Sequence, residues 1–119
     1  RVRKAGLRVG IISNHLCGWF DHWFTRFGLA ELFAEPDLIV VSARVGCAKP
    51  DSKIYELFSR QSGLSPQQCV FVDDKAENVA AAKALGWRAL QFRHIDKSGE
   101  LSEGVEALIQ KLRDNGVPI

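Results

Sequence analysis

Short apolar segments alternate with segments of helical periodicity along the 119 residues of this chain, and this alternation restricts the fold more than any other feature. In the apolar segments, Val, Ile, Leu and Phe mostly follow one another directly; these segments are 7–12, 38–41, 70–72 and 89–92. Such runs are typical of strands that are buried on both faces. The helical segments are 16–27, 52–62, 76–85 and 100–113. This order predicts an α/β fold with a doubly wound parallel sheet and helices on both of its faces.

Residues that start and stop helices support these boundaries. Residues 65–68 (SPQQ) have the form of a capping box with proline at the first helical position. Gly63 and Gly86 stand where helices are expected to end. The sequence contains no repeat and no linker, so we expect one domain or part of one.

Charge and hydropathy exclude several classes of partner. Sixteen Lys and Arg residues against 14 Asp and Glu leave a net charge of +2, and the basic residues are scattered. We therefore expect no nucleic-acid partner. The apolar runs are far shorter than the ~20 residues that span a bilayer, so we expect no membrane association. Three cysteines without a C-x-x-C pair argue against a disulfide framework and favour the cytoplasm.

Polar residues follow the predicted strands at the end where ligands bind in open parallel sheets. These residues are Ser13 and Asn14 after the first strand, Lys49 in the loop beyond the second, and Asp73, Asp74 and Asn78 at and after the third. Because the carboxyl ends of parallel strands share one edge of a sheet, we expect these side chains on one rim.

The chemistry of this rim fits Mg²⁺ and a phosphate group. Mg²⁺ prefers one or two carboxylates together with water and phosphate oxygens. Successive side chains of a strand point to opposite sides, so we expect Asp74 and Asp73 to act as one metal ligand and one supporting residue. Ser13 and Asn14 can donate hydrogen bonds to phosphate oxygens, and Lys49 supplies a positive charge. No nucleophile accompanies them.

Each of these residues also has an ordinary structural explanation. The Asp pair can cap the helix that follows it, and Asp51 can cap the helix that begins at Ser52. Residues 13–14 can form a simple turn. Helix capping and turns do not require polar residues at the same end of successive strands. Their occurrence at the same end therefore favours a binding site.

Three segments with their flanking residues resemble the haloacid dehalogenase (HAD) hydrolase superfamily. They are 10–14 (GIISN), 45–51 (VGCAKPD) and 70–74 (VFVDD), and the resemblance covers nearly all of residues 4–92. It is strongest to the branch that contains small phosphatases, 2-haloacid dehalogenases and the N-terminal domain of epoxide hydrolases. The resemblance implies a Rossmann-like, HAD-like core.

The resemblance also implies roles for individual residues. Ser13 matches the hydroxyl of the family's second motif, which bonds the transferring phosphoryl group, and Asn14 its neighbour in the substrate pocket. Lys49 matches the lysine of the third motif. Asp74 matches the metal-binding acid of the fourth, with Asp73 and Asn78 in support. The implied function is that of a Mg²⁺-dependent phosphatase acting on a small phosphorylated metabolite through an aspartyl intermediate. The alternative is a 2-haloacid dehalogenase acting on a halogenated substrate.

The family's first motif, Asp-x-Asp on the central strand, has no counterpart here. The sequence contains no methionine, so Arg1 is not a translation start. We therefore expect residues 1–119 to be a partial core domain that carries motifs two to four and lacks the central strand and the cap. A missing N-terminal segment is then the expected partner, a homodimer is a further expectation, and the chain alone should be inactive.

A different class of function stays open. A receiver-like signalling domain also combines an acid pair, a hydroxyl and a lysine at strand ends. In such a domain the acid pair would follow the first strand, whereas here it follows the third. A non-catalytic scaffold or phosphate-binding module remains the rival to an enzyme.

Overall fold

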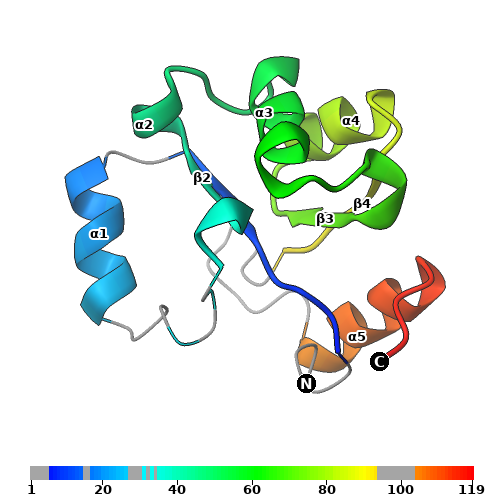
Figure 1. Ribbon diagram of the computed structural model, residues 1–119. Helices are drawn as coiled ribbons and strands as arrows, with labels where there is room; N and C mark the ends of the chain where they lie inside the picture. The colour runs from blue at the N-terminus through cyan, green and yellow to red at the C-terminus, as the bar shows by residue number, and fades with distance from the viewer. Residues whose placement is uncertain (1–5, 15–16, 27–30, 32, 34, 94–103) are drawn as a thin grey trace. The chain divides into compact units, whose positions relative to one another are not determined.

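The computed structural model describes residues 6–14, 17–26, 31, 33, 35–93 and 104–119 (Figure 1). The chain divides into two compact units, Val2–Leu64 and Ser65–Ile119. The first unit contains β1 (Ile11–Ser13), α1 (Cys17–Arg26), the 3-10 turn η3 (Pro36–Leu38), β2 (Ile39–Val41), α2 (Ser42–Val45) and α3 (Ser52–Ser62). The second contains the 3-10 turn η4 (Pro66–Gln68), β3 (Val70–Asp73), α4 (Ala76–Ala84), β4 (Arg88–Gln91) and α5 (Val105–Asp114).

In the first unit, β1 and β2 form a parallel pair in which Ser13 lies opposite Val41. Val40 and Val41 are both 1% exposed, so β2 is buried on both faces as its apolar run predicts. Helix α3 packs against both strands and against η3. It contributes Ile54, Tyr55 and Phe58 to the core.

The sequence determines where α3 begins and ends. The Asp51 carboxylate accepts a hydrogen bond from the Lys53 N–H at 3.0 Å and so caps the first turn. Gly63 follows the last turn with φ of +74°, a conformation that favours glycine. Both predictions, the Asp51 cap and the terminal glycine, are confirmed.

In the second unit, β3 and β4 form a parallel pair in which Asp73 lies opposite Gln91. Helix α4 contacts both strands (Figure 1). Its Asn78, Val79 and Ala82 are buried. The capping box is confirmed at η4, where the Ser65 N–H donates to Gln68 Oε1 at 2.8 Å.

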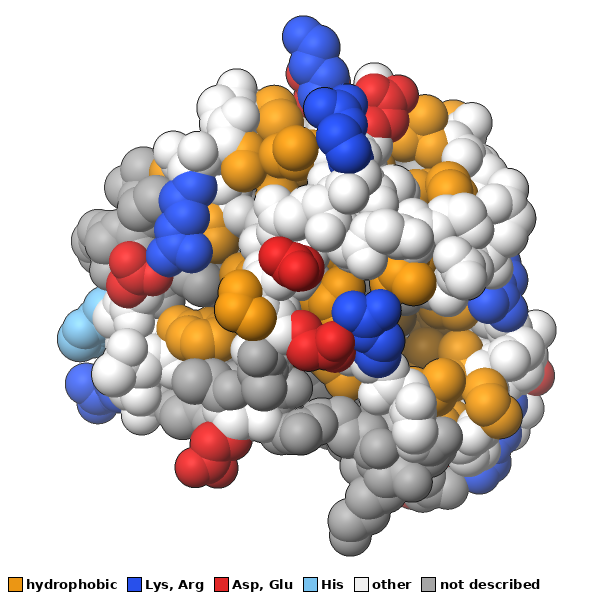
Figure 2. Space-filling model, viewed as in Figure 1, with side chains coloured by type: hydrophobic (Ala, Val, Ile, Leu, Met, Phe, Trp, Pro, Cys, Tyr) orange, Lys and Arg blue, Asp and Glu red, His pale blue; other side chains and the backbone are white. Residues whose placement is uncertain are grey.

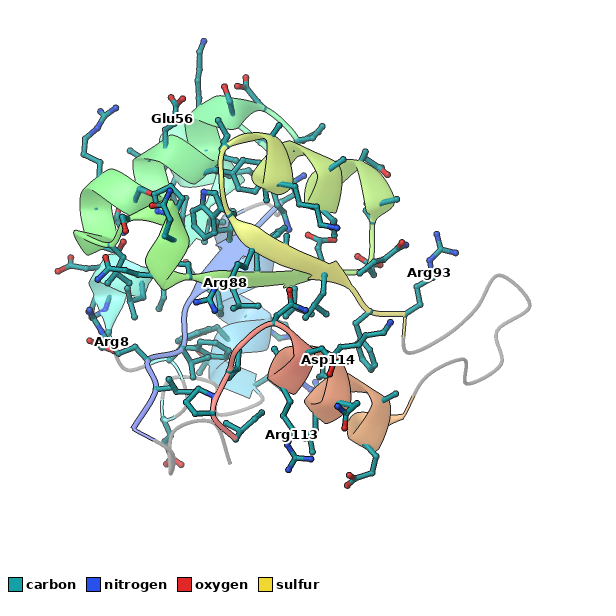
Figure 3. The ribbon with its side chains drawn as sticks, turned by 90° about the vertical axis from the view of Figure 1, so that its right-hand side faces the viewer. Arg8, Glu56, Arg88, Arg93, Arg113 and Asp114 are labelled. Atoms are coloured by element: carbon teal, nitrogen blue, oxygen red, sulfur yellow. The ribbon has the colours of Figure 1, made fainter. Side chains whose placement is uncertain are left out.

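Arg88 connects three segments of the second unit. It lies on β4 (Figure 3) and donates to the carbonyl of Asn115 at 2.7 Å and to that of Gln67 at 3.3 Å. Its guanidinium thus ties the end of α5 and the η4 turn to the same strand, since a planar fork of N–H groups can serve two acceptors.

Val72 departs from its predicted burial. It is 38% exposed, although it lies inside an apolar run. Side chains alternate along a strand, so Val72 faces away from the side on which Asp73 meets Asn78 of α4. The prediction that all four strands are buried on both faces is therefore wrong for β3.

Some predicted bounds also differ from the structure. The first strand is limited to Ile11–Ser13, because only these residues pair with β2. Helix α2 was not predicted, since its four residues are too few to show a helical period. For the segment predicted as the helix 100–113, residues 100–103 lie outside the described part, and α5 runs over Val105–Asp114.

The fold class is confirmed as α/β with parallel strands. Within the described residues, the strands form two separate two-stranded sheets, β1–β2 and β3–β4. On the face shown in Figure 2, the described Lys and Arg side chains are interspersed with Asp and Glu. None of the described helices is long and apolar enough to cross a membrane.

Candidate functional site

The predicted hydroxyl and amide lie at the carboxyl end of β1. Ser13 is the last residue of the strand and is half-buried, and Asn14 follows it at the surface. Pairing with β2 fixes the backbone of Ser13 opposite Val41. The Ser13 hydroxyl makes no hydrogen bond within the described part of the chain, so it can donate to a ligand.

Asn14 and Lys49 are joined by two hydrogen bonds. The Lys49 backbone N–H donates to Asn14 Oδ1 at 2.8 Å, and Asn14 Nδ2 donates to the Lys49 carbonyl at 2.9 Å. The side-chain amide therefore pairs with the backbone of a residue 35 positions away. These two predicted site residues are in direct contact.

Lys49 lies in a four-residue turn before α3. The Asp51 N–H donates to the Ala48 carbonyl at 2.9 Å, and the Lys49–Pro50 peptide bond is cis. This is the arrangement of a type VI turn. Because Asp51 also caps α3, the turn is attached to the helix that packs against β1 and β2.

The two acidic residues at the end of β3 have different environments. Asp73 is buried; its Oδ1 accepts from the Lys75 N–H at 2.9 Å and its Oδ2 accepts from Asn78 Nδ2 at 3.3 Å. Asp74 is exposed, and its carboxylate makes no hydrogen bond or ion pair with any described residue. Asp73 thus organises the start of α4, whereas Asp74 is available to a ligand.

Gln91 is a neighbour of this pair that the sequence did not single out. Its Nε2 donates to the backbone carbonyl of Asp74 at 2.9 Å, and Lys111 Nζ donates to the Gln91 carbonyl at 3.0 Å. The signal that could have identified it is its place at the end of β4, directly opposite Asp73 in the parallel register.

The donors at the end of β3 suit a hard divalent cation, although they are few. Asp74 offers an unengaged carboxylate, and the buried Asp73 carboxylate beside it is already held by two donors. Among the described residues, no group of three or more His, Cys, Asp or Glu side chains could hold a metal. These residues fit Mg²⁺ as part of a coordination shell, with the remaining ligands from water, substrate or other protein groups.

The predicted site residues thus form two sets, one in each unit. Ser13, Asn14 and Lys49 lie together in the first unit, and Asp73, Asp74 and Asn78 lie together in the second. The first set contains a hydroxyl and a lysine, and the second contains an exposed carboxylate on a fixed backbone. Such groups can bind phosphate and a cation, and neither set includes a nucleophile of the Asp-x-Asp type.

Comparison with known families gives one match to most of the chain. The profile of the haloacid dehalogenase-like hydrolases matches residues 1–92. The matched region includes both sets of site residues.

Two curated relatives cover most of the chain. Phosphatase MT3486 of Mycobacterium tuberculosis (strain CDC 1551 / Oshkosh) is 32% identical over 104 residues, which are 87% of this chain and 46% of that protein. Bifunctional epoxide hydrolase 2 of Sus scrofa is 30% identical over 121 residues, which cover 98% of this chain and 21% of that protein. The chain therefore spans less than half the length of either relative.

A solved structure has the same fold. The crystal structure of an uncharacterized protein from Corynebacterium glutamicum superposes with a TM-score of 0.72 at 19% sequence identity. The match covers 98% of this chain and 77% of that one.

Proposed function

This chain belongs to the haloacid dehalogenase-like hydrolases, and we propose that it is the part of a Mg²⁺-dependent phosphatase that binds the phosphoryl group and the metal. The observation that supports this proposal is the pairing of Asn14, the neighbour of Ser13 at the end of β1, with the backbone of Lys49. The 32% identity to a protein named as a phosphatase supports the choice of reaction. The substrate we propose is a small phosphorylated metabolite.

Ser13 and Lys49 bind the phosphoryl group in this proposal. The Ser13 hydroxyl donates a hydrogen bond to a phosphoryl oxygen, and the Lys49 ammonium balances its negative charge. Donors of this kind lower the barrier when they are already in place where charge develops.

Asp74 is the carboxylate ligand of Mg²⁺, and Asp73 with Asn78 supports it. The two hydrogen bonds to Asp73 fix the strand end from which Asp74 projects. Bound Mg²⁺ would polarise the phosphoryl oxygens and neutralise part of their charge.

We further propose that residues 1–119 carry motifs two to four of the core domain, with the nucleophile and the cap contributed by a segment outside this sequence. The nucleophile would be an aspartate that attacks phosphorus, so that the P–O ester bond breaks and the substrate's alcohol leaves; water would then hydrolyse the acyl phosphate to inorganic phosphate and free aspartate. The cytoplasm remains the expected location.

Strand edges give this proposal a physical consequence. Within the described residues, β1 and β3 each pair with one neighbouring strand only. Unpaired edges recruit other strands. By itself the chain should therefore dimerise or aggregate, and the N-terminal segment should suppress this association, as light scattering can measure.

Activity assays test the proposal directly. The chain alone should not hydrolyse an aryl phosphate with Mg²⁺ above background. The chain joined to the segment encoded upstream of it should turn over, and Lys49→Ala and Asp74→Asn should each reduce kcat by about 10²-fold or more. Lys53→Ala, at an exposed lysine in the first turn of α3, is the matched control and should leave kcat unchanged.

Three outcomes would contradict the proposal. Turnover by the chain alone that Lys49→Ala abolishes would require a nucleophile within these residues. Hydrolysis of a 2-haloacid in place of the aryl phosphate would favour the dehalogenase. No turnover with the upstream segment attached would favour a non-catalytic module.

A further inference from the structure

The contact between Asn14 and Lys49 uses the backbone of the lysine. Its N–H donates at 2.8 Å and its carbonyl accepts at 2.9 Å, both to the one carboxamide of Asn14. A carboxamide carries the same donor and acceptor as a peptide group. Asn14 therefore holds Lys49 as one residue of a neighbouring strand would.

The loop that carries Lys49 leads from α2 to α3. It runs from the end of α2, where Gly46 has φ of +74°, to the Asp51 cap of α3. No strand pairs with it in the described structure, and the turn itself is closed by one bond, from the Asp51 N–H to the Ala48 carbonyl. The two bonds from Asn14 connect this turn to the end of β1, which β2 fixes in register.

We propose that Asn14 is a positioning residue that acts through Lys49 and does not bind the phosphoryl group itself. The inference rests on the proposed function, because it assumes that Lys49 meets a phosphoryl oxygen. A lysine ammonium sits at the end of a flexible four-carbon stem. The position of the Lys49 backbone therefore determines which positions its ammonium group can reach. Fixing both the N–H and the carbonyl of Lys49 restricts these positions before phosphate binds.

The proposal differs from direct recognition by Asn14 in a measurable way. If Asn14 acts through Lys49, removing its amide must release the Lys49 backbone and weaken phosphate binding together. If Asn14 binds phosphate directly, binding must weaken while the Lys49 backbone stays protected. Amide hydrogen exchange and phosphate titration separate these two cases.

The experiment compares Asn14→Ala with the unmodified chain. Asn14→Ala should accelerate amide exchange at Lys49 by about tenfold or more relative to exchange at Ile54, whose N–H bonds to the Asp51 carbonyl. Titration with inorganic phosphate, followed by the NMR signals of Lys49, should show a several-fold higher Kd. Asn115→Ala is the matched control, because Asn115 Nδ2 also donates to a backbone carbonyl, that of Lys111, at 2.8 Å. It should change neither measurement.

Asn14→Asp serves as a second variant in case Asn14→Ala does not fold. An aspartate keeps the acceptor for the Lys49 N–H and loses the donor to its carbonyl, so exchange at Lys49 should accelerate less than in Asn14→Ala. Unchanged amide hydrogen exchange at Lys49 in both variants would show that Asn14 does not hold the Lys49 backbone, and would overturn the proposal.

The remaining outcomes are equally decisive. Faster exchange with unchanged phosphate affinity would show a merely structural contact and overturn the positioning role. Weaker phosphate binding with unchanged exchange would assign direct binding to Asn14 and also overturn it. Absence of any phosphate response at Lys49 in the unmodified chain would overturn the proposed function, whatever the exchange data show about the contact.

Discussion

The side-chain amide of Gln91 donates a hydrogen bond to the backbone carbonyl of Asp74 at 2.9 Å. Gln91 ends β4, and Asp74 is the first residue after β3, so this bond joins the end of β4 to the start of the loop that follows β3. The carboxylate of Asp74 remains exposed while its backbone is held.

Replacing Gln91 by leucine should weaken binding of a divalent cation at Asp74. Loss of the amide frees the Asp74 carbonyl, and the carboxylate then samples more orientations before it binds. We expect a several-fold increase in the Kd for Mg²⁺ by calorimetric titration. Gln110→Leu is the matched control, since Gln110 donates at 2.9 Å to Asp114 on the same helix. Equal affinities for the two variants would contradict this role of Gln91.

Asp74→Asn should abolish Mg²⁺ binding by the isolated chain. The unmodified chain should itself bind only weakly, at about the millimolar scale, because one direct carboxylate leaves most of the coordination shell to water. Calorimetry with MgCl₂ provides the measurement. Micromolar binding that survives Asp74→Asn would place the metal elsewhere.

Asn78→Ala should lower the free energy of unfolding by about 1–3 kcal/mol, because it removes a donor from a buried carboxylate. Asn78 is 3% exposed, and its Nδ2 donates to Asp73 Oδ2 at 3.3 Å. Urea denaturation monitored by circular dichroism gives the free energy. A loss below about 0.5 kcal/mol, the range of ordinary surface substitutions, would show that this bond matters little.

Gly10→Ala should destabilise the first unit by about 1–3 kcal/mol through overpacking. A Cβ atom at Gly10 would lie 2.7 Å from the Leu38 carbonyl oxygen and 3.0 Å from Cζ of Phe58. Gly104→Ala is the control, because no atom lies within 4 Å of its added Cβ. The melting temperatures of the two variants should differ clearly, and similar melting temperatures would argue against the close approach of Gly10 and Leu38.

The bounds of a helix or strand can be predicted when the residues that set them lie within it or next to it in the sequence. The bounds of α3, Ser52–Ser62, are predictable because Asp51 and Gly63 mark both ends within the segment itself. The length of β1 is not, because a strand extends only as far as its partner, and β2 begins at Ile39. The exposure of Val72 likewise depends on which side of β3 meets α4.

The same distinction applies to the candidate site, because some of its features follow from neighbouring residues and others depend on residues far away in the sequence. The alternation of side chains along a strand predicts that Asp73 and Asp74 differ, and the structure has one buried and the other exposed. Their roles toward a metal remain predictions. The bonds of Asn14 to Lys49 were not predictable, because they depend on the path of a loop 35 residues away.

Arg88 shows that solvent exposure and tolerance to substitution are separate properties. The residue is exposed, and exposure taken alone suggests that its side chain can be replaced freely. Its guanidinium nonetheless donates to two carbonyls, those of Gln67 and Asn115, which lie near the start and the end of the second unit's sequence. A lysine has one compact ammonium in place of a planar fork, so even this exchange of like charges would release one of the two segments. Selection should therefore act on this surface position as it does on a core residue.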